Sequence, residues 1–121
     1  MIEVARTKKP QAPPPNVIFE ALTQPHRDPT REWLRLETGE IEPTVLDARE
    51  FESVVWSTLW PNYPSATIAF EMTSDKANSG SVLTWTLEVE PPAPDPEAIR
   101  LLRHRINELV NRDMRNILFD C

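Results

Sequence analysis

The last quarter of the chain repeats its apolar positions with the period of an α-helix. Asp95, Pro96 and Glu97 open this segment with a capping side chain, a first-turn proline and an acid at the positive end of the helix dipole. The apolar side chains that follow recur at three- and four-residue steps and share one arc of the helix: Ile99, Leu102, Ile106, Leu109, Val110, Met114 and Ile117. The pattern predicts a long amphipathic C-terminal helix that packs on an apolar surface.

The residues before this helix follow a period of two, which is typical of strands with one buried face. The clearest alternation is at residues 83–88, where the apolar Leu83, Trp85 and Leu87 are each followed by a threonine or a glutamate. Because the links between successive strands are short, we expect an antiparallel meander. The predicted strands cover residues 1–9, 32–36, 41–49, 53–60, 67–73 and 82–89.

Prolines refine this arrangement. Pro43 cannot donate to a sheet ladder, so the strand over residues 41–49 is expected at an edge or a bulge. Residues 16–23 predict a short helix, because the prolines before it delay its start and Pro25 ends it. Together the patterns predict a single α+β domain over residues 1–121, with one curved antiparallel sheet around the C-terminal helix and the short helix at one end of the sheet.

Composition narrows the function classes. Hydrophobic residues make up 40% and charged residues 26% of the chain, an ordinary balance for one globular domain. The net charge of −6 opposes general nucleic-acid binding, so no nucleic-acid partner is expected. No apolar run approaches the roughly 20 residues of a membrane span, and the start has no signal-peptide core. We therefore expect a cytoplasmic protein.

Neither a metal nor a cofactor is expected. Cys121 is the only cysteine, which excludes an internal disulfide and a thiolate cluster within the chain. His26 and His104 have no second ligand at metal-binding spacing. The arginines of the final helix spread around its wheel, which favours a solvated face over a phosphate-binding one: Arg100, Arg103, Arg105, Arg112 and Arg115.

Four short segments carry a family resemblance. They are a Pro-Pro-x-x-Ile-Phe helix opening at residues 14–19, a Gly-Glu-Ile turn at 39–41, Val-Val-Trp-Ser at 54–57 and Leu-Thr-Trp at 83–85. With the order of elements, they resemble the helix-grip fold of the START-like, or SRPBCC, superfamily, which includes Bet v 1-like proteins, polyketide cyclases and activators of chaperone ATPases. The resemblance implies a ligand cavity between the sheet and the C-terminal helix. Members are usually longer and carry a second small helix, so the shorter segment here predicts a cavity that is smaller, more open or completed by another subunit.

The candidate ligand-binding residues follow from strand and helix alternation, with an ordinary packed core as the alternative for the apolar ones. They are Val54, Trp56, Ile68, Phe70, Met72, Leu83, Trp85, Leu87, Ile106, Val110 and Asp113. Asp113 falls inside the apolar arc, where a carboxylate is costly without a partner. It forms either the polar end of the cavity or a structural pair with an arginine or a backbone amide, unless the helix end turns it outward. Arg103 flanks the same arc, where it either pairs with a ligand carboxylate or extends its charged end into solvent.

The sequence thus predicts binding of an apolar or amphipathic small molecule, lipid-, polyketide- or hormone-like. Two alternatives remain open, a cyclase- or hydrolase-type enzyme acting on such a ligand and a protein-interaction module like the chaperone-ATPase activators. No catalytic residue is identified. The short entrance segment and the interruption at Pro43 also predict exposed apolar surface, and hence a homodimer that buries Trp33 or Trp60.

Overall fold

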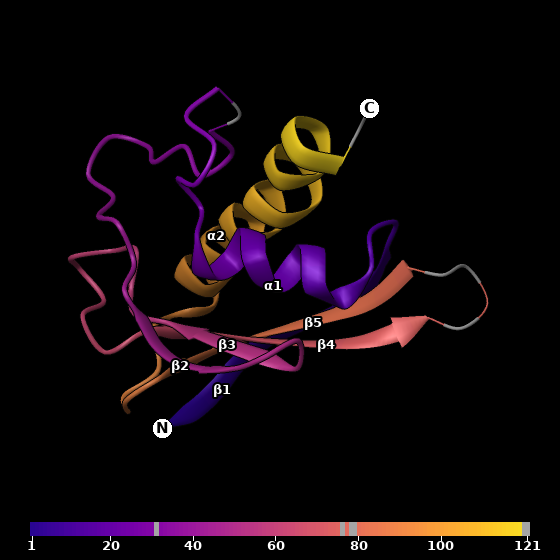
Figure 1. The fold of residues 1–121 in the computed structure, drawn as a ribbon. Coiled ribbons are helices and arrows are strands. Elements are labelled where there is room, and N and C mark those ends of the chain that lie inside the picture. Colours follow the sequence, from indigo (N-terminus) through magenta and orange to yellow (C-terminus); the bar gives the residue numbers. More distant parts are fainter. Residues whose placement is uncertain (31, 76, 78–79, 120–121) are drawn as a thin grey trace.

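The chain folds into one sheet with helices on one of its faces (Figure 1). The computed structural model describes residues 1–30, 32–75, 77 and 80–119, the last three by their backbone alone. The sheet has five antiparallel strands in the order β1-β5-β4-β3-β2. The elements are β1 (Ile2–Gln11), α1 (Pro15–Thr23), β2 (Val45–Arg49), β3 (Ser53–Trp56), β4 (Thr67–Asp75), β5 (Gly80–Val89), α2 (Pro96–Asn107) and η1 (Glu108–Phe119). This α+β, helix-grip arrangement confirms the predicted fold class.

The strand register brings the predicted apolar residues onto one face. Cross-strand partners in an antiparallel pair share a face of the sheet. The pairs Val54↔Phe70 and Trp56↔Ile68 join β3 to β4, and Phe70↔Trp85, Ile68↔Leu87 and Met72↔Leu83 join β4 to β5. All of these side chains are buried beneath the helices. The inner face is therefore a continuous apolar surface rich in aromatic rings.

The segment between α1 and β2 differs from the prediction. No strand forms over residues 32–36, and the strands predicted over residues 41–49 and 53–60 shorten to β2 and β3. Trp33 and Leu34 are adjacent and both buried, which a half-buried strand does not allow. The Ile41 N–H instead donates to the Leu59 carbonyl at 2.8 Å, and neither residue belongs to a strand. The segment is an irregular covering over the core.

The C-terminal helix begins as predicted but changes its winding midway. The Asp95 carboxylate accepts the Ala98 amide at 2.8 Å and caps α2. From Glu108 onward the helix is a π-helix, whose hydrogen bonds run from residue i to i+5. Met114 is buried as predicted, while the side chain of Ile117 and all of Cys121 lie outside the described residues. Across the described part of the chain, no helix combines the length and apolar character needed to span a bilayer.

We expect Gly80→Ala to destabilise the fold by about 1–3 kcal/mol, the usual cost of overpacking. A Cβ at Gly80 would overlap the Gln11 carbonyl oxygen and lie 2.8 Å from the Ala12 carbonyl oxygen, both of them backbone atoms that cannot rotate away. Urea denaturation followed by circular dichroism measures the loss. Thr84→Ala, at a half-buried position of β5, is the control and should cost about 1 kcal/mol or less. Equal effects of the two substitutions would contradict this close approach.

Candidate functional site

Three aromatic side chains form a connected row on the inner face of the sheet. The Trp56 ring lies edge-on to Phe70 at a centroid distance of 5.0 Å, and Trp33 stacks on Trp56 at 6.0 Å. The Trp56 indole N–H donates to the Leu22 carbonyl at 2.9 Å, which ties the row to α1. The Trp33 side chain, only 1% exposed, has an indole N–H with no acceptor among the described residues. A buried donor without a partner is uncommon and needs a physical explanation.

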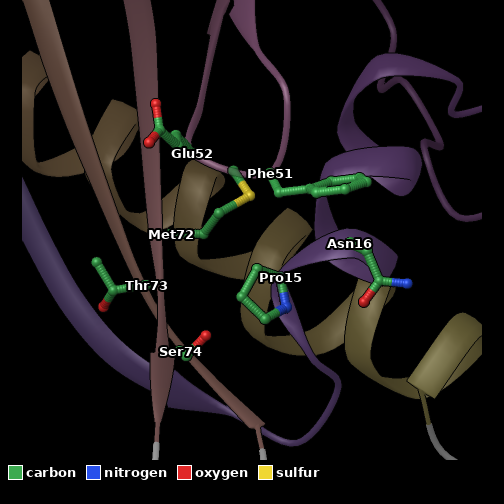
Figure 2. Close-up of a pocket in the computed structure, with 7 residues that line it drawn as sticks. All are labelled: Pro15, Asn16, Phe51, Glu52, Met72, Thr73 and Ser74. Atoms are coloured by element: carbon green, nitrogen blue, oxygen red, sulfur yellow. The ribbon is translucent and has the colours of Figure 1, made fainter.

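A groove opens at the end of this inner face (Figure 2). Its volume is about 780 Å³, within the range of small-molecule sites. Residues from the start of α1, the turn between β2 and β3 and the end of β4 line it: Pro15, Asn16, Phe51, Glu52, Met72, Thr73 and Ser74. Phe51 is exposed, holds a backbone φ of 63° and packs edge-on against Phe19 at 5.7 Å. The groove thus combines apolar walls with a few polar groups.

The structure brings the apolar candidates together in one core. Each of them is at most 3% exposed, and together they form the surface between the sheet and the helix. Met72 is the member that also lines the groove. The other groove residues were not predicted, because they come from a turn, a helix start and a strand end that no periodic pattern connects. That the buried candidates contact a ligand stays a prediction.

Side-chain amides form a polar chain where the helix crosses β1 and β5. Asn107 Oδ1 accepts the Trp85 indole N–H at 3.2 Å and the Asn111 amide at 3.3 Å. Gln11 of β1 in turn donates to Asn111 Oδ1 at 3.3 Å. These bonds satisfy the Trp85 N–H within the core, which distinguishes it from that of Trp33.

A buried ion pair fastens the irregular segment to the helix. Arg105 holds Glu40 with two bonds of 2.9 Å, from Nε to Oε2 and from Nη2 to Oε1, and the two side chains are each 7% exposed. Arg105 Nη2 also donates to the Arg35 carbonyl at 2.7 Å. Glu40 accepts the Trp60 indole N–H at 3.2 Å and the Glu37 amide at 2.8 Å. Such complete pairing is what makes two buried charges tolerable.

The ionisation of this pair follows from its contacts. Burial alone would raise the pKa of Glu40, but the hydrogen bonds from Arg105, the Glu37 amide and Trp60 bring it below its ordinary value. Burial lowers the pKa of Arg105, whereas the hydrogen bonds to Glu40 and the nearby carboxylate charges raise it. The raising effects together are the larger, so the pKa of Arg105 lies above its ordinary value. Both groups are therefore charged at neutral pH.

Arg105 corrects the prediction of a solvated arginine face. The residue stands three positions after Leu102 and four before Leu109, which places it on the buried side of the helix. The spacing in the sequence therefore indicated that Arg105 would be buried. Arg103 is exposed. Asp113 is mostly buried, with Oδ1 at 2.9 Å from Arg112 Nε and Oδ2 at 3.9 Å from Arg105 Nη1. Asp113 is thus paired with an arginine, as one of the alternatives expected, and that it contacts a ligand stays a prediction.

Solved structures share this fold at low sequence identity. The Aha1 dimer from Colwellia psychrerythraea matches with a TM-score of 0.67 and 14% identity over 98% of both chains. A START superfamily protein from Mycobacterium smegmatis matches at 0.66 and 12% identity, over 96% of this chain and 97% of the other. DynU16, a protein of the dynemicin biosynthetic locus, matches at 0.68 and 17% identity over 95% of this chain and 47% of its own. No protein-family model and no curated protein matches the chain.

The protein therefore has a START-like, or SRPBCC, fold, as its sequence patterns indicated. The likeness extends over nearly all of the chain.

We expect Arg105→Met to lower the free energy of unfolding by about 3–5 kcal/mol, because it leaves the Glu40 carboxylate buried without its partner. The double variant Arg105→Met/Glu40→Leu should recover much of that loss, since it removes both charges. Chemical denaturation measures both. Arg103→Met, at an exposed position of the same helix, should change stability by no more than about 0.5 kcal/mol. A loss below about 1 kcal/mol for Arg105→Met would contradict the role given to the pair.

The same pair predicts a pH dependence. The pKa of Glu40 is lower in the folded protein than its ordinary 4.5, so its contribution to stability is present above about pH 4.5 and is lost as the pH falls through the folded-state value. Glu40→Gln should therefore destabilise the protein most at neutral pH, and the difference from the wild type should shrink below about pH 4.5. Melting curves recorded between neutral and acidic pH check this. A difference that is constant with pH would contradict it.

Proposed function

We propose that the protein binds an apolar or amphipathic small molecule, which enters through the groove and lies against the inner face of the sheet. The groove beside α1 carries the proposal. It has the volume of a ligand site and reaches Met72, the one inner-face candidate at its border. Phe51 and Pro15 offer further apolar contact, while Asn16, Thr73 and Ser74 offer hydrogen bonds that would orient a polar group.

The aromatic row behind the groove supports the same function. Phe70 lies two residues before Met72 on the same face of β4 and leads inward to Trp56 and Trp33. The unpaired indole N–H of Trp33 could donate to one oxygen of a ligand that enters this deeply. An apolar ligand with a hydroxyl, carbonyl or carboxylate group fits these features, which describes lipid-, polyketide- and hormone-like molecules.

The polar groups favour binding over catalysis. Asp113 is paired with arginines, and the Asn107 amide oxygen already accepts two hydrogen bonds. A catalytic acid or base needs a hydrogen-bonding direction open to the substrate. The START superfamily protein and DynU16 among the structural neighbours share the fold and specify neither a ligand nor a reaction. We also propose a cytoplasmic location, as expected from the sequence.

Long-chain fatty acids and a hydrophobic fluorescent probe should raise the melting temperature and change tryptophan fluorescence. Ligand that binds only the folded state stabilises it by about 2.7 kcal/mol at a free concentration of 100 times Kd. Thermal melts and fluorescence titrations measure the two effects. If no member of a panel varied in chain length and head group produces either effect, the protein does not bind this class of ligand.

A matched pair of variants locates the site. Ser74→Phe fills the groove from an exposed position at the end of β4 and should weaken binding about tenfold without lowering stability, because the added ring meets the ligand and not the core. Glu71→Phe places the same ring on β4 outside the groove and should leave binding unchanged. Equal affinities of the two variants would show that the ligand does not use the groove.

A further inference from the structure

Strand β2 leaves one edge of the sheet open. All five of its residues are exposed, and on its outer side no strand of the described residues pairs with it. The Arg49 carbonyl accepts the Glu52 amide at 2.9 Å, which turns the polar backbone groups of Arg49 toward β3. Backbone groups alternate in direction along a strand, so the N–H and C=O of Ala48 point away from the sheet. These two groups can pair with another strand.

The two edges of the sheet differ in how they are protected. Edge strands commonly avoid pairing through lysine and proline, and β1 carries Lys8, Lys9 and Pro10 in succession. Strand β2 has neither residue within its bounds. Exposed apolar side chains also gather around it, which a solvated edge does not require: Ile41, Val45, Leu46 and Phe51. The β2 edge is therefore the better suited of the two to associate with another chain.

The charges on β2 complement a second copy of β2. Asp47 and Arg49 flank Ala48, lie on the same outer face and have no ion-pair partner among the described residues. A twofold axis through Ala48 in an antiparallel pairing sets Asp47 opposite Arg49 of the second copy, and Arg49 opposite its Asp47. Ala48 then faces Ala48 of the second copy, and each donates its N–H to the other's carbonyl. Opposed charges in directly facing positions stabilise such a pair.

A hollow on the outer face of the sheet adjoins this edge. It has a volume of about 400 Å³ and lies beside β2, with Asp47 and Arg49 at its border. Two further carboxylates, Glu52 and Glu71, line the same hollow. Because the second copy carries the same groups, the favourable contacts across the axis are the two between Asp47 and Arg49.

We propose that β2 is a homodimerisation edge, at which a second copy of this chain adds its own β2 in antiparallel register centred on Ala48. The two sheets then become continuous across the twofold axis, with Val45 and Leu46 of each copy in the paired strands. The interface differs from the one expected from the sequence. Trp33 is already buried within a single chain, and the Trp60 indole N–H is bonded to Glu40.

Charge reversal tests the register directly, by analytical ultracentrifugation of the wild type and of Asp47→Arg and Arg49→Asp. Each single variant opposes like charges at both facing positions and should raise the dimer dissociation constant by about tenfold or more. An equimolar mixture of the two variants restores opposite charges at both positions and should form a heterodimer. Because that mixture assembles only from folded chains, it separates lost pairing from lost folding.

Two further variants sharpen the result. Ala48→Pro removes an N–H that the β2–β3 ladder does not use, so it should weaken the dimer while leaving the circular dichroism spectrum unchanged. Lys8→Glu changes the charge of the opposite edge and should leave the dissociation constant unchanged. A wild type that stays monomeric at its highest soluble concentration overturns the proposal. Single variants that dimerise like the wild type, or a mixture that does not assemble when both variants are monomeric, also overturn it.

Discussion

The ion pair between Arg105 and Glu40 is the interaction on which the rest of the structure depends. The segment between α1 and β2 has no strand or helix to hold it, yet it places Trp33 and Leu34 over the core. Arg105 anchors this segment at the Glu40 carboxylate and at the Arg35 carbonyl. Because two buried charges are stable only when fully paired, few other positions of the segment are compatible with the fold. The same segment carries Trp33, which stacks on Trp56.

The elements that were predicted correctly are those with local signals. The alternation through Leu83, Trp85 and Leu87 reflects a strand that buries one face along its whole length. The cap at Asp95 and the stop at Pro25 act within a few residues and can be read directly from the sequence. No local signal specifies the structure of residues 32–36. Their two buried side chains, Trp33 and Leu34, are adjacent in the chain, and the segment is held by a hydrogen bond from the distant Arg105. Local patterns therefore predicted the sheet and helices but not the covering.

The candidate site was predicted only where it coincides with the core. Met72 follows from strand alternation, whereas Phe51 owes its position to a turn with a positive φ that no periodic pattern encodes. The winding of the C-terminal helix changes at Glu108, which no sequence pattern indicated. The α-helical wheel nevertheless assigns the buried face correctly beyond that point, at Leu109, Val110 and Met114. Asp113 lies in this region, and its arginine partners became evident only from the three-dimensional structure.

The unpaired indole of Trp33 has a consequence for the free energy of folding. A buried donor without an acceptor costs about 1–3 kcal/mol. Stacking on Trp56 and burial hold the ring, so its N–H keeps one direction. Packing of the ring must therefore offset this cost for the covering to stay closed over the core. An oxygen of the proposed ligand that reached this N–H would recover part of the cost on binding.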